Sequence, residues 1–239
     1  MSSRRSFLKT ASAATAGLAF SYRLPAWAVA PSTGEVHVWG TYRDMRHVPL
    51  GGLAWKPATV IAATAIALNP YAMRQQVLGF GAAMTDATCY VLSRLTGAER
   101  VPVMHDLFAP DEMALNVCRT TIGASDYSRT VYSYDESPVP DPKLKKFSIE
   151  HDKAYILPML REARKANPEL FLFSSPWSPP GWMKPDNTML GGAMRKLSFG
   201  PYAEYFRRFI EDYKADGVTI DAVTVQNETD AEQEGRMPA

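Results

Sequence analysis

The 239-residue chain is poor in the residues that bind metals or form disulfide frameworks. It holds two cysteines, Cys89 and Cys118, and four histidines, with no spacing typical of a metal site. We therefore expect neither a metal nor an organic cofactor, and His105 and His151 are interpreted as structural. One cysteine falls in a predicted helix and the other in a predicted strand. Two separate buried thiols are expected, with a disulfide as the alternative.

The chain also lacks an excess of either charge and a long apolar run. The formal net charge is +1, but Arg4, Arg5, Lys9 and Arg23 lie in the first thirty residues, which contain no acid. The remainder is weakly acidic, so we expect no nucleic-acid partner. The apolar stretch at residues 11–20 is short and rich in Ala, Ser and Thr. It does not predict an integral membrane span.

The first thirty residues have the layout of an export signal. Arg4 and Arg5 precede Phe-Leu-Lys, the mild apolar run follows, and small residues stand near Ala26 and Ala28. The paired arginines indicate a twin-arginine signal over residues 1–30, with a basic amphipathic helix as the alternative. We expect the mature protein to be periplasmic or secreted.

The hydrophobic period changes once along the chain. Residues 31–75 contain short strand-like runs at 36–39, 59–61 and 65–68, with a turn at 51–52, and form a predicted N-terminal β segment. From residue 76 to 239, strands starting near 76, 114, 170 and 219 alternate with helices at 85–95, 97–108, 148–166 and 201–215. This order predicts an α/β domain of parallel βαβ units. The long loops follow the strands, at the end that is the active face of a barrel.

Candidate site residues stand at these strand ends. The apolar strand beginning at residue 220 stops at Asn227 and Glu228, and a carboxylate in that position is a potential proton donor. A solvated surface glutamate is the alternative. Arg119 lies inside an apolar strand and needs a partner, and Asp126 follows soon after. The two form either a structural ion pair or part of a sugar site.

Trp177 and Trp182 stand in a proline-rich loop after the third predicted strand of this domain. Indole rings there offer faces on which a sugar stacks, and buried loop packing is the alternative for both. Residues 78–84 imitate a dinucleotide fingerprint, but Met84 occupies the third glycine position. Nicotinamide binding is therefore a remote option, and the glycines are interpreted as allowing close backbone approach.

Four segments, at 78–86, 119–128, 174–182 and 223–228, together resemble glycoside hydrolase family 30, and in particular its glucosylceramidase type. The similarity runs from about residue 36 to Glu228. It implies the N-terminal half of a (β/α)8 TIM barrel, with the preceding strands belonging to a β-sandwich. It also implies a retaining hydrolase of β-glucosides, glycolipids or β-glucans.

The resemblance implies specific roles. Glu228 would be the general acid/base and Asn227 the donor to the sugar 2-hydroxyl. Asp126 and Trp177 would bind the glycone, Arg119 would support the catalytic carboxylates, and Asp86 is a further substrate-binding candidate.

Retention also needs a second carboxylate about 5 Å away. In this family it lies on a late strand, and Glu232 and Glu234 are poor substitutes. We therefore expect a truncated barrel that is inactive alone, with exposed strand edges and an exposed apolar helix face. The alternatives are an endo-β-1,6-glucanase or xylanase of the same family, and a non-catalytic carbohydrate-binding protein.

Overall fold

A computed structural model describes residues 35–54, 64, 72–229 and 237–238 of the chain. The chain divides into two compact units, Met1–Arg74 and Gln75–Ala239. The predicted export signal and the predicted strands at 59–61 and 65–68 lie outside the described residues. No helix among the described residues is long and apolar enough to cross a membrane.

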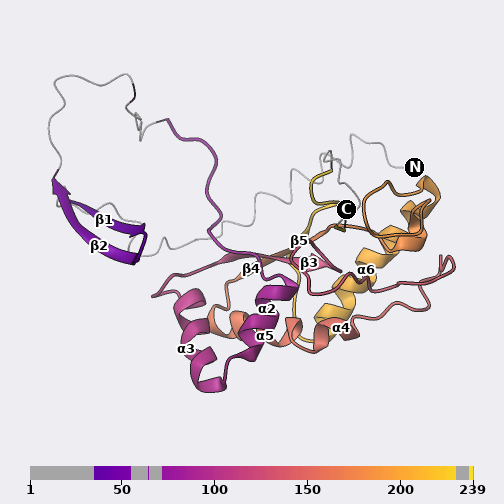
Figure 1. Cartoon of the computed structure of the whole chain (residues 1–239), viewed down its shortest axis with the longest axis horizontal. Coiled ribbons are helices and arrows are strands. Elements are labelled where there is room, and N and C mark those ends of the chain that lie inside the picture. The colour runs from indigo at the N-terminus through magenta and orange to yellow at the C-terminus, as the bar shows by residue number, and fades with distance from the viewer. Residues whose placement is uncertain (1–34, 55–63, 65–71, 230–236, 239) are drawn as a thin grey trace, which may run out of the picture. The chain divides into compact units, whose positions relative to one another are not determined.

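The first unit contains an antiparallel ribbon of β1 (Glu35–Tyr42) and β2 (Met45–Ala54), which Figure 1 shows in indigo. β1 includes the strand predicted at 36–39. The turn predicted at Gly51 and Gly52 is wrong, because both residues lie inside β2. The pairing register shifts between His37 and Trp39, and Gly51 has a φ of 87°, so a bulge occupies this position. The β-sandwich stays a prediction.

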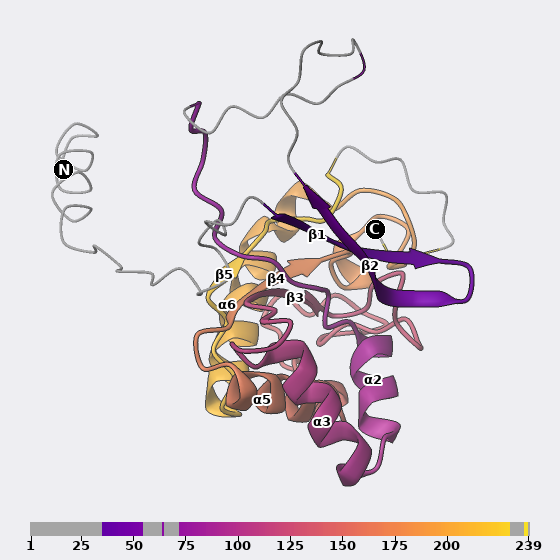
Figure 2. The same ribbon diagram turned by 90° about the vertical axis from the view of Figure 1, so that its left-hand side faces the viewer.

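The second unit is built on a parallel sheet in the order β3-β4-β5. The strands are β3 (Val117–Ile122), β4 (Phe171–Pro176) and β5 (Ala222–Val223). The α-helices are α2 (Asp86–Arg94), α3 (Gly97–Phe108), α4 (Glu150–Lys153), α5 (Ile156–Ala166) and α6 (Phe199–Ala215). Short 3₁₀ turns occupy Gly181–Met183 and Lys196–Ser198. In Figures 1 and 2, α2, α3, α5 and α6 lie on one side of this sheet. The predicted α/β class is confirmed.

Local sequence signals explain where α2 and α3 begin. Thr85 caps α2 by accepting the N–H of Thr88, and Thr96 caps α3 in a reciprocal capping box with Glu99. The helix predicted at 148–166 is instead interrupted between α4 and α5. Tyr155 has φ −153° and ψ −26° at this break, and its hydroxyl reaches Asp86 in α2. A tertiary contact therefore accompanies the interruption.

Two predicted strands differ from expectation. Residues 76–81 form no regular strand, because the Asn116 side chain accepts the Phe80 N–H, and one parallel bridge pairs Ala83 with Arg119. A Cβ on Gly81 would lie 1.7 Å from the Val117 carbonyl oxygen, so this close approach requires glycine.

The last strand, predicted as buried, is the two-residue β5. Its neighbour Val225 is 85% exposed, since no further strand among the described residues covers that edge.

The core of the second unit encloses a carboxylate. Asp152 in α4 is fully buried and accepts hydrogen bonds from the hydroxyls of Tyr132 (2.9 Å), Tyr134 (2.6 Å) and Tyr213. Burial raises the pKa of Asp152, although the three hydroxyls act in the opposite direction. Both cysteines are buried free thiols, which confirms that expectation.

The hydrogen bonds to Asp152 predict that two substitutions lower the unfolding free energy by different amounts. Asp152→Ala removes the common acceptor and leaves buried hydroxyls without it, so we expect a loss of about 3 kcal/mol or more in unfolding free energy. Tyr213→Phe removes one donor and should cost about 1 kcal/mol. Urea unfolding of the 239-residue chain measures both, with the exposed Asp111→Ala as control. Equal losses for Asp152→Ala and Asp111→Ala would contradict the role of Asp152.

Candidate active site

The ends of the parallel strands surround a cavity of about 300 Å³. Because β3, β4 and β5 run in one direction, the residues that follow each strand reach the same edge of the sheet. Of the six residues to which the family resemblance assigns a role, five line this cavity and Asp86 does not. The lining residues are Ala83, Thr85, Arg119, Asp126, Tyr127, Trp177, Asn227, Glu228 and Met237.

Arg119 connects all three strand ends. It lies on β3, its Nη1 donates to Asn227 Oδ1 at 3.2 Å, and its Cζ lies 4.7 Å from the centre of the Trp177 ring. Stacking on an indole face suits the flat guanidinium. The ion pair with Asp126, one of the two alternatives for these residues, is not formed. Among the described residues, an amide oxygen and an aromatic face are the partners of the Arg119 guanidinium.

Trp177 follows β4 directly and is held by its backbone. Its carbonyl accepts a hydrogen bond from Gln226 Nε2 at 2.6 Å, which ties this position to the segment after β5. The residue is 5% exposed, and Arg119 covers one ring face. A sugar in the cavity can therefore contact only a small part of the indole, and the ring offers no open face for stacking.

Trp182 has a different environment, although it shares the proline-rich loop. Its side chain is buried, and Nε1 donates to the carbonyl (2.9 Å) and the carboxylate (3.0 Å) of Asp135. Burial raises the pKa of Asp135 to about 6, against the opposing effect of the Trp182 hydrogen bond. Trp182 thus packs the loop, as its structural alternative proposes.

Asn227 and Glu228 both line the cavity although they are neighbours in sequence. Successive side chains of an extended strand point to opposite faces. Here the Asn227 N–H is anchored on the Pro176 carbonyl at 2.9 Å, and Glu228 takes a left-handed backbone conformation with φ 48°. That conformation is uncommon for a residue other than glycine, and it breaks the alternation.

Asp126 is exposed and lies in a short turn after β3. The Ser125 N–H donates to Ser128 Oγ at 2.8 Å, and the Tyr127 N–H donates to Ser125 Oγ at 3.1 Å. These bonds stabilise the shape of the turn on both sides of Asp126. Tyr127 is also exposed at the cavity and was missed by the sequence argument, although it adjoins a candidate residue.

Asp86 is the sequence candidate that the structure places outside the cavity. Its carboxylate is fully buried, and Oδ1 accepts the Arg129 N–H at 2.8 Å. Oδ2 accepts the Tyr155 hydroxyl at 2.5 Å and lies 2.9 Å from His151 Nε2. Burial opposes ionisation, but the bonds from His151, Tyr155 and the Arg129 N–H together lower the pKa of Asp86. Its position supports packing rather than contact with a substrate.

A second, larger hollow of about 1000 Å³ adjoins the cavity and shares Trp177, Asn227 and Glu228 with it. It runs along α6 and β5 and is lined largely by apolar side chains, including Met194, Phe199, Tyr202, Phe206 and Val225. Phe199 and Val225 are exposed there, whereas Tyr202 is buried, so the expected exposed helix face stays a prediction. The smaller cavity gathers the charged and polar candidates, so we place the chemistry there.

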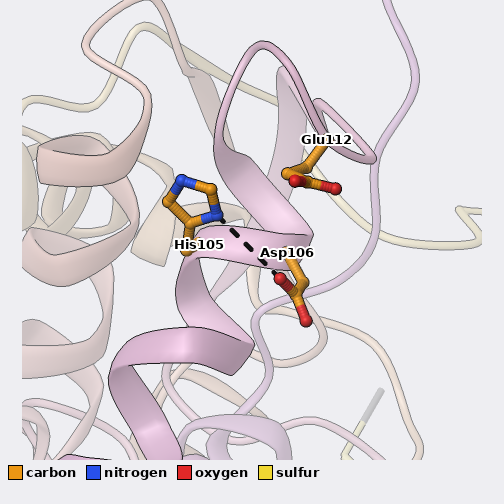
Figure 3. A group of neighbouring side chains, drawn as sticks. All are labelled: His105, Asp106 and Glu112. Carbon is orange, nitrogen blue, oxygen red and sulfur yellow. Dashed lines mark ion pairs between the residues drawn. The ribbon is translucent and has the colours of Figure 1, made fainter.

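One group of possible metal ligands occurs among the described residues, at the end of α3. Figure 3 shows His105, Asp106 and Glu112, whose ligand atoms lie within 4.8 Å of one another. All three are exposed, and none lines the cavity. Exposed acidic groups commonly gather in this way without an ion, so the group is given no metal-binding role.

The lowered pKa of Asp86 predicts a pH dependence of stability. An unfolded aspartate titrates near pKa 3.9, so the stabilisation by Asp86 is fully present above about pH 4 and is lost as the pH falls through the lower folded pKa. We therefore expect the unfolding free energy of the wild-type chain to fall more steeply below about pH 4 than that of Asp86→Asn. Urea unfolding at several pH values tests this. Parallel curves for the two proteins would contradict it.

Comparison with known proteins identifies the family. Residues 77–238 match the model of the glycosyl hydrolase family 30 TIM-barrel domain. An endo-1,6-beta-D-glucanase of Neurospora crassa is 36% identical over 166 residues, which are 67% of this chain and 35% of the relative. The lysosomal acid glucosylceramidase of Mus musculus is 32% identical over 173 residues, which are 70% of this chain and 33% of the relative. The chain thus spans about a third of the length of these curated relatives.

Solved structures agree with this result. An endo-beta1,6-glucanase structure matches with a TM-score of 0.64 and 32% identity, covering 70% of this chain and 38% of that one. SrfJ from Salmonella typhimurium matches with a TM-score of 0.67 and 26% identity, covering 78% and 42%. The predicted family and TIM-barrel class are confirmed. The chain belongs to glycosyl hydrolase family 30.

Proposed function

We propose that the native polypeptide carrying this sequence is a retaining glycosidase that cleaves β-glucosidic bonds, with Glu228 as its general acid/base. The supporting observation is the meeting of Arg119, Trp177, Asn227 and Glu228 around one cavity at the ends of three parallel strands. Fold membership alone would not assign chemistry, so the proposal rests on this arrangement of side chains.

Glu228 performs both proton transfers. In the first step its carboxyl group donates a proton to the oxygen of the leaving group as the glycosidic bond breaks. In the second step the resulting carboxylate takes a proton from the water that attacks the anomeric carbon. The exposed position of Glu228 at the cavity allows both the leaving group and the water to reach it.

Asn227 orients the sugar. Since Arg119 donates to its Oδ1, the amide nitrogen is the group left to face a ligand, and it donates to the sugar 2-hydroxyl. Asp126 accepts hydrogen bonds from other hydroxyls, and Trp177 contributes an apolar contact. Arg119 adds a fixed positive charge at the cavity, which favours the ionised carboxylates of the reaction.

The attacking carboxylate is a separate requirement. Retention needs it about 5 Å from the acid/base. Among the described residues, Asp126 and Glu228 are the carboxylates that line the cavity, and we assign Asp126 to sugar binding. Glu232 and Glu234 lie outside the described residues. We therefore propose that residues 1–239 alone bind sugar without turnover.

Two substrate classes fit the proposal. The matched relatives are named as glucosylceramidases and endo-1,6-beta-D-glucanases, so the glycone is proposed to be glucose. A glycolipid is the first candidate. A 1,6-linked β-glucan is the second, favoured by the 36% identity to the Neurospora crassa protein. Comparing the rate of glucosylceramide hydrolysis with the rates on 1,6-, 1,3- and 1,4-linked β-glucans separates the two.

We propose as well that the polypeptide is exported and acts in the periplasm or outside the cell.

The acid/base role predicts a dependence on the leaving group. In Glu228→Ala, an alkyl β-glucoside, whose leaving group needs a proton, should be cleaved about 10² to 10⁴ times more slowly than by the wild-type polypeptide. For 2,4-dinitrophenyl β-glucoside, whose leaving group needs no proton, the bond-breaking step should be nearly unchanged. Added azide should then restore turnover by attacking without base assistance. Steady-state rates and the burst of released dinitrophenol measure both effects.

The control is Glu112→Ala, an exposed carboxylate in the turn after α3 that does not line the cavity. It should leave both rates unchanged. If Glu228→Ala slows the two substrates equally, residue 228 is not the acid/base. If the wild-type polypeptide binds glucosides and cleaves none, the carbohydrate-binding alternative holds in place of the hydrolase.

A further inference from the structure

The turn that carries Asp126 reaches the cavity from the side of β3. Residues 123–129, here called the Asp126 loop, contribute both Asp126 and Tyr127 to the lining. The internal bonds between Ser125 and Ser128 determine the shape of this loop. The loop follows β3 directly, and its Ala124 N–H donates to the Tyr132 carbonyl at 2.9 Å, so its C-terminal half is the part that needs contacts with another element.

Helix α2 supplies those contacts. The Arg129 N–H donates to Asp86 Oδ1 at 2.8 Å, and the Ala87 N–H donates to the Tyr127 carbonyl at 3.1 Å. The Arg129 guanidinium also lies over the ring of Tyr90, with Cζ 3.6 Å from the ring centre. Three contacts therefore join the C-terminal half of the loop to the first turns of α2.

The Asp86 carboxylate is also fixed by two side chains outside the loop. Its Oδ2 accepts the Tyr155 hydroxyl at 2.5 Å and lies 2.9 Å from His151 Nε2. The His151 ring stacks on Tyr132, with 3.6 Å between the ring centres. The carboxylate is fully buried, so it cannot touch a sugar in the cavity, but it offers the loop an acceptor whose position is fixed.

We propose that Asp86 is a positioning residue for the sugar site. By accepting the Arg129 N–H it holds the Asp126 loop against α2, and this sets where the Asp126 carboxylate meets the sugar. The proposal rests on the proposed function for its sugar-binding part. A hydrogen bond from a backbone N–H to an ionised carboxylate is stronger than one between neutral groups. Because binding depends closely on geometry, a small displacement of the Asp126 carboxylate should lower the sugar affinity strongly.

Two substitutions at residue 86 separate the acceptor from the charge. Asp86→Ala removes the acceptor, and we expect the affinity of the native polypeptide for a glucose-configured iminosugar to fall about tenfold. Asp86→Asn keeps an oxygen that can accept the Arg129 N–H, so the affinity should stay within about threefold of wild type. Isothermal titration with the iminosugar measures both.

A double-mutant cycle distinguishes positioning from general destabilisation. If Asp86 acts through Asp126, the variant Asp86→Ala/Asp126→Asn should bind no more than about twofold more weakly than Asp126→Asn alone. Independent effects would instead multiply and would overturn the proposal. The control is Arg100→Met, which breaks the 3.0 Å ion pair with Glu162 between α3 and α5 and should leave sugar affinity unchanged.

Hydrogen exchange provides a readout that needs no sugar. In Asp86→Ala, amide exchange in the Asp126 loop (residues 123–129) should accelerate about tenfold or more, while residues 156–166 of α5 stay as protected as in wild type. Unchanged exchange in the loop overturns the proposal even if sugar binding weakens. Accelerated exchange in a polypeptide whose wild type binds no sugar supports the positioning role and contradicts the proposed function.

A second variant covers the case in which Asp86→Ala does not fold. Arg129→Met keeps the backbone N–H but removes the guanidinium from the face of Tyr90. It should also accelerate exchange in the loop and weaken iminosugar binding, both by less than Asp86→Ala because the Asp86 bond remains. If Arg129→Met alters neither property, the attachment of the loop to α2 does not control the site and the proposal fails.

Discussion

The candidate site depends on the two contacts that the Arg119 guanidinium makes. The guanidinium extends from β3, stacks on the indole that follows β4 and donates to the amide that follows β5. A lysine could neither stack in this way nor present a flat donor to Asn227. Because the amide oxygen is taken, the orientation of Asn227 is fixed before a ligand arrives. One side chain therefore connects the three strand ends and prepares the neighbouring donor.

The parallel sheet explains why most of the candidate site could be predicted from the sequence. Four of the candidates lie in a strand or follow its end, and parallel strands bring those ends together. They are Arg119, Trp177, Asn227 and Glu228. Asp86 could not be placed in the same way. It follows Thr85, which does line the cavity, but the direction of its side chain is determined by His151 and Tyr155, more than sixty residues away.

Other differences between sequence and structure also come from long-range contacts. Helices α2 and α3 were predictable from their caps, and α6 from its apolar face, because these are local features. The irregular pairing at residues 76–81 involves the side chain of Asn116. The tyrosine hydroxyls that donate to Asp152 come from a loop and from α6. The exposure of β5 and the apolar hollow beside α6 reflect a missing neighbour among the described residues rather than a weak strand signal.

We propose one sugar site at the three strand ends, with Glu228 at the leaving-group oxygen. A crystal structure of the native polypeptide with a non-hydrolysable β-thioglucoside tests this most directly. We expect glucose in the cavity of Arg119, Asp126 and Trp177, with the carboxyl group of Glu228 within hydrogen-bonding distance of the position of the glycosidic atom. Glucose bound elsewhere, or in this cavity with the side chain of residue 228 directed away from it, would contradict the account.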